Sequence, residues 1–278
     1  MSKITTTIST NNNLDYLKLA IKSVRKNAYY KDQPIIVHAE NCTDGTNNWL
    51  DSNYRKYDIE YYIDNNNDPK GIGGGMNFCV DKVKTEFVNI IHSDMWIAPN
   101  QDLELLKLYD DIGDTKLIAS SFRIQPRIFV NDPDYRPGTV FVDTDDFGAY
   151  AEDFDSDSFD NWAQEFSQMN DDLEVRKGGG AGFFCRVDKD LFIRIQLEGY
   201  KFRMIPRSVV WHFSARGSHF RDEAKDKFHM KSKRQQESEQ INVEKFIKKW
   251  GRLPEEDSDT FVKPIEGTNV KTRMEWSI

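Results

Sequence analysis

The residue of this sequence best placed for chemistry is Asp94, which follows an apolar segment, Phe87 to Ile91, in the run His92-Ser93-Asp94. The segment is expected to be a strand, so the carboxylate stands at its C-terminal end. Hard cations such as Mg²⁺ and Mn²⁺ take oxygen ligands and bridge them to substrate phosphates. Because Asp is also common in turns, the position by itself is compatible with a metal ligand or with a turn cap.

A second group of candidates lies in the C-terminal half, where Asp188 and Asp190 precede His212. A carboxylate can act as a general base, and a neutral imidazole can bind a metal or contact a phosphate. The alternatives are a solvated helix start for the two aspartates and an ordinary strand-end histidine. Arginines near His212 suit phosphate oxygens, although an ordinary charged surface explains them equally well: Arg203, Arg207, Arg216 and Arg221.

A glycine-rich run, Gly71 to Gly75, could let backbone N–H groups approach a phosphate at a helix N-terminus. The run is neither a GxGxxG after a first strand nor a GxxxxGK[ST]. It therefore indicates neither a dinucleotide-binding fold nor a P-loop, and a flexible turn is the simpler interpretation.

Repeated strand–helix units in the first hundred residues would position these groups. Strands are expected at residues 3–9, 34–39, 59–63 and 87–92, and helices at residues 14–24, 47–56 and 76–84. Units of this length imply a mostly parallel sheet with right-handed crossovers. Ligands bind beyond the carboxyl ends of such strands, so three loops are expected to converge on one site: Thr10–Asn12, Glu40–Thr43 and Ser93–Asp94.

The second half is less regular. Residues 125–177 show no clear period, which is typical of a binding loop or a lid. Their aromatic residues could stack on the rings of a ligand or form the segment's own core: Phe147, Tyr150, Phe154, Phe159, Trp162 and Phe166. Strands are expected at 117–124, 201–206 and 209–213, and helices at 188–197 and 222–250.

The composition indicates a soluble globular chain and excludes a disordered, fibrous or membrane-embedded one, with 38% hydrophobic residues and a mean hydropathy of −0.69. The net charge, 38 − 46 = −8, argues against a surface built to bind nucleic acid. Residues 143–172 hold eleven acidic and no basic residues, whereas residues 186–252 carry 17 − 9 = +8. The basic half suits a diphosphate, and the acidic segment disfavours a polyanionic acceptor.

Three scattered cysteines, Cys42, Cys79 and Cys185, suggest neither a zinc site nor a disulfide framework. The first residues lack the apolar stretch of a signal peptide, and no apolar run of about 18 residues occurs. The expectation is a cytoplasmic protein without a membrane span.

Taken in order, several segments resemble glycosyltransferase family 2, whose fold is GT-A. The resemblance covers about residues 3–220, and residues 221–278 would form a C-terminal helical extension and tail. The segments that carry it are Ile8–Asn12, Val37–Thr46, Asn67–Asn77, His92-Ser93-Asp94 at the position of the family's Asp-x-Asp, Val187–Leu191 with Arg194 and Gly199, and then Pro206 and His212.

The resemblance implies an α/β protein, a single GT-A-like (Rossmann-like) domain with a mostly parallel central sheet flanked by helices. Residues 1–100 would bind the nucleotide sugar, and residues 101–220 would hold the acceptor and catalytic half. The implied reaction is transfer of a sugar, with inversion, from a UDP- or GDP-sugar to a carbohydrate or other hydroxyl acceptor, using Mn²⁺ or Mg²⁺. The implied donor-binding residues are Thr10, Asn12, Glu40, Gly71, Asn77, Ser93 and Asp94.

For the metal, the resemblance implies Asp94 together with His212, and for the base that deprotonates the acceptor it implies Asp188. Asp190 is an alternative base because the segment before it is short, and Asp172 is a further one. The sequence departs from the family pattern where His92 and Ala39 replace aspartates, Met76 replaces an arginine and Val187 replaces a glutamate. Two other classes stay open, namely a non-catalytic GT-A-like sugar-binding or assembly module and a nucleotidyltransferase.

Overall fold

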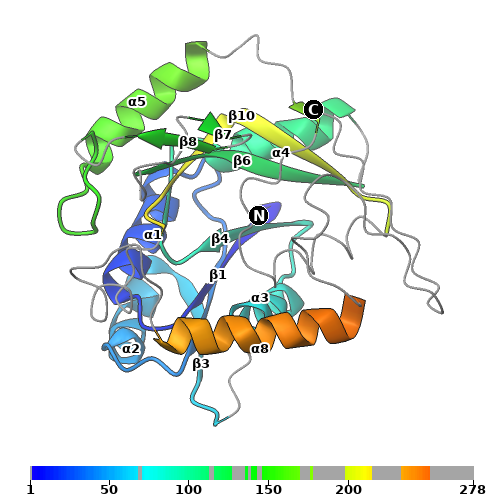
Figure 1. Cartoon of the computed structure of the whole chain (residues 1–278). Helices are drawn as coiled ribbons and strands as arrows, with labels where there is room; N and C mark the ends of the chain where they lie inside the picture. Colours follow the sequence, from blue (N-terminus) through cyan, green and yellow to red (C-terminus); the bar gives the residue numbers. More distant parts are fainter. Residues whose placement is uncertain are drawn as a thin grey trace.

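Two β-sheets with helices packed on their faces form the core of the chain (Figure 1). This computed structural model describes residues 2–67, 71–112, 116–126, 135–136, 139–142, 146–169, 176–177, 198–214 and 233–250. In the first sheet, four parallel strands follow the order β3-β2-β1-β4. Their bounds are β1 Ile4–Thr10, β2 Ile35–Glu40, β3 Ile59–Asp64 and β4 Phe87–His92.

Three helices connect these strands: α1 Leu14–Asn27, α2 Thr46–Tyr57 and α3 Gly71–Lys82. Helices α1 and α2 cover one face, where Leu17 and Leu50 pack into a single apolar cluster with Ile8 and Val37. Helix α3 packs against β1 and β2. A right-handed crossover places each helix against the sheet, as expected for parallel strands with short connections.

Gly75 allows α3 to approach the sheet closely. A Cβ on Gly75 would collide with the side chains of Ser9 on β1 and His38 on β2. The expected flexible run ahead of a helix from Met76 is wrong, because the helix already begins at Gly71. Sequence spacing alone does not distinguish a glycine needed for close packing from one in a turn.

In the second sheet, the order is β5-β10-β6-β8-β7, and β9 pairs with β10. Strand β6 runs parallel to both β10 and β8, whereas β5, β7 and β9 pair antiparallel with their neighbours. The bounds are β5 Met95–Ile97, β6 Leu117–Pro126, β7 Tyr135–Arg136, β8 Thr139–Val142, β9 Arg176–Lys177 and β10 Lys201–His212.

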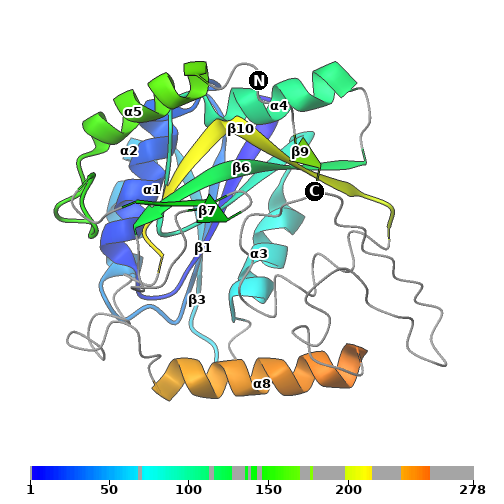
Figure 2. The same ribbon diagram turned by 45° about the horizontal axis from the view of Figure 1, so that its top comes forward.

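Three further helices complete the described structure: α4 Gln101–Ile112, α5 Ser156–Met169 and α8 Lys233–Trp250. Helix α4 packs on β10 and β6, and α5 packs on β10. Figure 2 shows α8 below α3, at the opposite end of the molecule from α4 and α5. No helix in the described ranges is long and apolar enough to cross a membrane.

The α/β class with a parallel central sheet is confirmed, and the early strands and helices agree with expectation to within a few residues. Residues 201–213 do not form the two separate strands that were expected. Strand β10 is one strand that continues past Pro206, and its register against β6 shifts between Ile205 and Val209. The helices expected at 188–197 and over 222–232 lie outside the described residues. Strand β5 and helix α4 were not predicted.

The described part of residues 125–177 contains a helix, α5, that the lack of a period did not predict. Its aromatic rings pack in one cluster with β10. Phe159, for example, is fully buried, with its ring centroid 5.5 Å from that of Trp211. Phe147 is buried in the same cluster, and three rings that are partly buried pack against it: Phe154, Trp162 and Phe166. These five rings therefore contribute to the apolar core, and the stacking of the partly buried rings on a ligand stays a prediction.

Buried polar side chains join the two sheets. Asn89 of β4 donates to Gln101 Oε1 at the start of α4 (3.0 Å), and Gln101 Nε2 donates to Ser121 Oγ of β6 (2.8 Å). Ser121 Oγ in turn lies 2.8 Å from Ser208 Oγ of β10. Because unpaired polar groups are costly away from water, this chain of hydrogen bonds holds the sheets in one relative position.

Another buried polar contact attaches α5 to α1 and β5. Asp160 Oδ1 accepts hydrogen bonds from Asn27 Nδ2 (2.9 Å) and Trp96 Nε1 (2.8 Å), and Oδ2 lies 2.9 Å from Lys26 Nζ. The neighbouring Asp157 also pairs with Lys26, but its side chain is 83% exposed. The two aspartates therefore share a partner and differ in burial.

We predict that Asp160→Ala lowers the free energy of unfolding by about 2–4 kcal/mol, because it leaves the buried donors of Asn27 and Trp96 unpaired. Asp157→Ala is the matched control and should change it by less than about 1 kcal/mol, since an exposed ion pair contributes little. Urea unfolding followed by circular dichroism measures both values. Equal effects of the two substitutions would show that the Asp160 contacts do not hold α5 in place.

Candidate functional site

Three loops at the carboxyl ends of the first sheet meet, as expected from its parallel strands. Asn11 Nδ2 donates to the Glu40 carbonyl (2.5 Å), and Asn12 Oδ1 accepts from the Thr43 backbone N–H. Asn13 Nδ2 donates to Ser93 Oγ (3.0 Å). Asparagine suits these turns because it tolerates the left-handed backbone that Asn12 adopts, with φ of 50°.

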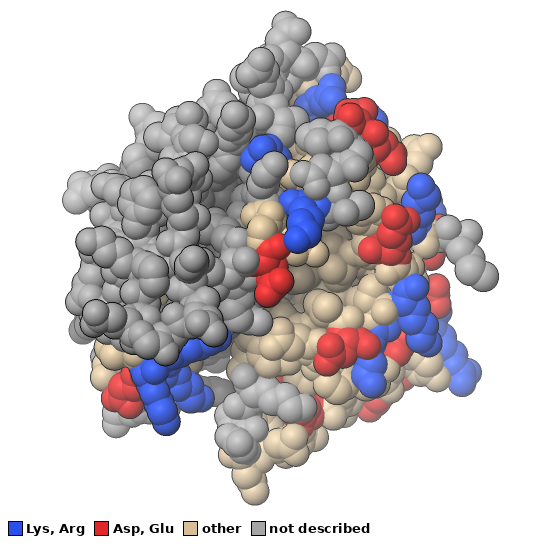
Figure 3. All heavy atoms as spheres, turned by 90° about the vertical axis from the view of Figure 1, so that its right-hand side faces the viewer, with Lys and Arg blue, Asp and Glu red and all other residues tan. Residues whose placement is uncertain are grey.

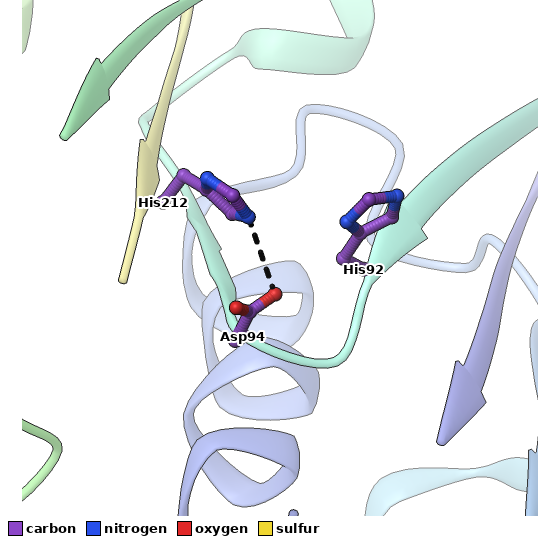
Figure 4. Close-up of side chains that lie close together, drawn as sticks. All are labelled: His92, Asp94 and His212. Atoms are coloured by element: carbon purple, nitrogen blue, oxygen red, sulfur yellow. Dashed lines mark ion pairs between the residues drawn. The ribbon is translucent and has the colours of Figure 1, made fainter. Parts of the chain in front are cut away.

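Beside these loops, His92, Asp94 and His212 form a cluster in which one ligand atom from each lies within 4.8 Å of the others (Figure 4). His92 ends β4 and His212 ends β10. Asp94 stands just before β5, whose pairing of Met95 with His212 brings the carboxylate to the imidazole. The Phe213 N–H also donates to the Asp94 carbonyl, at 3.0 Å.

The distances in the cluster suit one bound cation. His212 Nε2 lies 3.5 Å from Asp94 Oδ1, and the two imidazole centroids lie 5.8 Å apart. Two donor atoms bound to one ion at about 2.1 Å, at angles of about 90–110°, lie about 3.0–3.4 Å apart. One carboxylate oxygen and two imidazole nitrogens therefore fit a divalent ion with small adjustments of the side chains. Among the described residues, this is the group of His, Cys, Asp and Glu with such spacing.

Protonation also favours a cation here. Burial acts against the charge on Asp94, but His212 and then His92 outweigh it and hold the pKa of this carboxyl below its usual value. Burial lowers the pKa of His212, with Arg123 and His92 acting in the same direction and Asp94 opposing them. At neutral pH the carboxylate is ionised and the imidazole of His212 is neutral, the states that bind metals.

Two residues that sequence reasoning missed lie beside the cluster, on β6. Gln125 is buried and its Oε1 lies 3.3 Å from His212 Nδ1, and Arg123 is buried close enough for its charge to affect His212. Polar residues at alternate positions of an otherwise apolar strand were the available signal. Nothing in the sequence showed that this strand lies next to His212.

The predicted donor-binding residues occupy different environments. Thr10 is buried, and within the described part of the chain its Oγ1 has no hydrogen-bond partner. Glu40 is also buried, and its Oε2 accepts from the Gly71 N–H at the start of α3 (2.9 Å). This contact occupies the N–H expected to approach a phosphate. Asn77 is exposed on α3.

Of the arginines near His212 in the sequence, Arg207 lies away from the cluster. Its Nε is 3.2 Å from Glu104 Oε2 of α4. Arg216 and Arg221 lie outside the described residues, as do the predicted bases Asp188 and Asp190 and the further candidate Asp172. The charged groups that the structure places at the cluster are Asp94 and Arg123.

Charge on the described surface is mixed. Figure 3 shows Lys and Arg interspersed with Asp and Glu over the described part of one face. The acidic and basic segments found in the sequence therefore do not form a patch of one charge on the described part of this face.

The described cysteines are not nucleophiles. Cys42 and Cys79 are free, and burial raises the pKa of the Cys79 thiol to about 12 and also raises that of Cys42. The reactive form of cysteine is the thiolate, so both thiols are poorly reactive at neutral pH.

Comparison with known protein families shows which family the chain belongs to. The family model described as "Glycosyl transferase family 2" matches residues 5–192, which include the convergent loops, His92 and Asp94. The chain belongs to glycosyl transferase family 2. The expected family is thus confirmed, and a search of curated protein sequences finds no match to this chain.

The GT-A fold of this family 2 chain is confirmed by its similarity to the solved structure of GalNAc-T7. GalNAc-T7 with UDP, GalNAc and Mn²⁺ is similar with a TM-score of 0.52 and 12% identity, over 76% of this chain and 43% of that one. TarS of S. aureus has a TM-score of 0.48 and 14% identity, over 77% of this chain and 37% of that one. Its 1–349 fragment in complex with UDP has a TM-score of 0.47 and 13% identity, over 76% of this chain and 60% of that one. The chain therefore spans less than two thirds of the length of each.

Proposed function

We propose that this protein is an inverting glycosyltransferase that moves a sugar from a nucleotide-diphosphate sugar to an acceptor hydroxyl with the help of a divalent metal. The observation that carries the proposal is the cluster of His92, Asp94 and His212 in a family 2 chain. Asp94 stands at the second aspartate of the family's Asp-x-Asp, and the two histidines supply further ligand atoms beside it. Family membership supports the transferase class, and the cluster supports metal dependence.

The donor is proposed to be a UDP- or GDP-sugar bound along the convergent loops. Thr10 supports this because its buried hydroxyl has no partner within the described residues, and a ligand group would pair with it. Asn12, Ser93 and Asn77 are proposed to line the same pocket. Glu40, which accepts from the Gly71 N–H, is proposed to hold the start of α3 at the edge of the pocket.

Charge at the cluster is compatible with a diphosphate. Arg123 is buried close enough for its charge to act on His212. A divalent ion held by Asp94 would add positive charge that diphosphate oxygens can ligate. When bound, the ion stabilises the charge that develops on the departing diphosphate, and Arg123 is proposed to add to this stabilisation.

The reaction needs one displacement. The acceptor oxygen attacks the anomeric carbon while the bond from that carbon to the phosphate oxygen breaks, so the configuration inverts and the nucleoside diphosphate leaves. The proton of the acceptor hydroxyl passes to a carboxylate, proposed to be Asp188 or Asp190. The acceptor is proposed to be a carbohydrate or another hydroxyl compound.

Location and metal identity complete the proposal. Free cysteines are typical of a reducing compartment, which supports a cytoplasmic enzyme.

For the ion we propose Mn²⁺ or Mg²⁺, with Mn²⁺ preferred. Imidazole nitrogen suits first-row transition metals, whereas Mg²⁺ takes oxygen ligands almost exclusively.

We predict that the wild-type protein hydrolyses at least one UDP- or GDP-sugar in the presence of Mn²⁺ and that Asp94→Ala reduces the rate by at least about 100-fold. Removal of the metal with EDTA should abolish turnover, and added Mn²⁺ should restore it. Release of the nucleoside diphosphate, followed with a coupled assay, measures all three. Asp15→Ala is the control, because this carboxylate on α1 is exposed and pairs with Lys18.

The same panel of nucleotide sugars distinguishes the alternatives. Thermal stabilisation by a nucleotide sugar without turnover would favour a non-catalytic sugar-binding module. If no member of the panel gave either turnover or stabilisation with Mn²⁺, the transferase proposal would be abandoned.

We predict that His92→Asp narrows the preference for Mn²⁺ over Mg²⁺, because it exchanges an imidazole nitrogen for a carboxylate oxygen. His92→Ala should weaken Mn²⁺ binding by about 10-fold or more through loss of one ligand. Titration of free Mn²⁺ by electron paramagnetic resonance, with Mg²⁺ as competitor, measures both. Unchanged Mn²⁺ affinity in His92→Ala would remove His92 from the ligand set and leave Asp94 and His212.

A further inference from the structure

Gln125 occupies a position that the reaction proposed above does not use. It is buried on β6, the strand that runs parallel to β10 with Trp211 opposite Ile124. Side chains alternate along both strands, so the next residues, Gln125 and His212, project to the same face. Their side chains meet, with His212 Nδ1 3.3 Å from Gln125 Oε1.

This contact determines which imidazole nitrogen is available. An amide oxygen only accepts hydrogen bonds, so Nδ1 of His212 carries the proton when it faces Oε1. When a metal ion takes the place of a hydrogen between His212 Nε2 and Asp94 Oδ1, which lie 3.5 Å apart, the ring keeps its one hydrogen on Nδ1 and its lone pair on Nε2. A metal binds only the nitrogen that carries no proton, so this tautomer points the ligand atom into the cluster.

We propose that Gln125 is a positioning residue that fixes the tautomer and the ring orientation of His212 for metal binding. This inference rests on the proposed metal site. Partners of this kind on metal-bound histidines typically change metal affinity by about 10–100-fold when removed. Nothing in the contact requires Gln125 to touch the substrate or the ion, so its effect passes through His212.

The neighbouring residues explain why the position suits an amide. Arg123, two residues earlier, lies on the same face of β6, whereas Phe122 and Ile124 face the aromatic cluster on the other side. A neutral amide acceptor at Gln125 orients the ring of His212 without adding a further charge to the cluster.

The first test measures the tautomer on wild-type protein loaded with Zn²⁺, a diamagnetic ion that imidazole binds, because without metal Nε2 can instead donate to the Asp94 carboxylate. Long-range ¹H–¹⁵N spectra of protein labelled at its five histidines distinguish a proton on Nδ1 from one on Nε2, and comparison with His212→Asn assigns the signal. The expected result is a single Nδ1–H form for His212. A ring protonated on Nε2 would overturn the proposal.

The second test measures Mn²⁺ affinity by electron paramagnetic resonance. Gln125→Leu should weaken binding by about 10–100-fold and populate the Nε2–H form, whereas Gln125→Glu, which keeps an acceptor, should retain most of the affinity. Gln33→Leu is the control, because Gln33 is equally buried but contacts Thr6 and Asp102. It should lower the melting temperature and leave Mn²⁺ affinity unchanged.

The outcomes separate this inference from the proposed function. If wild type binds Mn²⁺ and Gln125→Leu binds it as tightly as Gln33→Leu does, the positioning role is wrong and the metal site stands. If wild type binds no Mn²⁺, the metal site and the role of Gln125 are both wrong. Loss of affinity in Gln125→Leu, with retention in Gln125→Glu and Gln33→Leu, supports the inference.

Discussion

The antiparallel pairing of β5 with β10 is the interaction on which the candidate site depends. Strand β5 has only three residues, yet it places Met95 opposite His212 and so brings Asp94 to the end of a strand more than a hundred residues away. His92 joins them because it ends β4, two residues before Asp94. The tight connection between the two sheets therefore creates the cluster, and the buried hydrogen bonds from Asn89 through Gln101 to Ser208 maintain the same relative position deeper in the core.

Burial makes the cluster chemically distinct from an ordinary surface carboxylate with two histidines. Because His212 is desolvated, its pKa is lowered and its neutral form is favoured. The pKa of Asp94, which contacts His212, lies below its usual value in spite of the burial of Asp94. Arg123 adds a buried positive charge on the neighbouring strand.

Local sequence predicted secondary structure well where an element's own residues determine its conformation. The strands at Ile35 and Phe87 and the turn after Thr10 follow from apolar runs and asparagines, and the approach of their carboxyl ends follows from parallel topology. Local sequence predicted the structure poorly where a distant partner decides. The Gly71–Gly75 run has the composition of a loop, yet it is helical, and its Gly75 lies where β1 and β2 leave no room for a side chain. Pro206 is typical of a strand end, yet β10 continues past it because β6 supplies a partner.

The sequence by itself determined the α/β class and the family, and it named Asp94 and His212 as candidate ligands, because those inferences depend on short motifs and on the period of apolar residues. Only the tertiary structure decided that His92 is a third ligand candidate and that Gln125 and Arg123 lie beside His212. It also decided that aromatic residues of the acidic segment contribute to a core. Each of these depends on contacts between strands far apart in the chain. Cross-strand neighbours are set by sheet order and register, which no local pattern in a single sequence encodes.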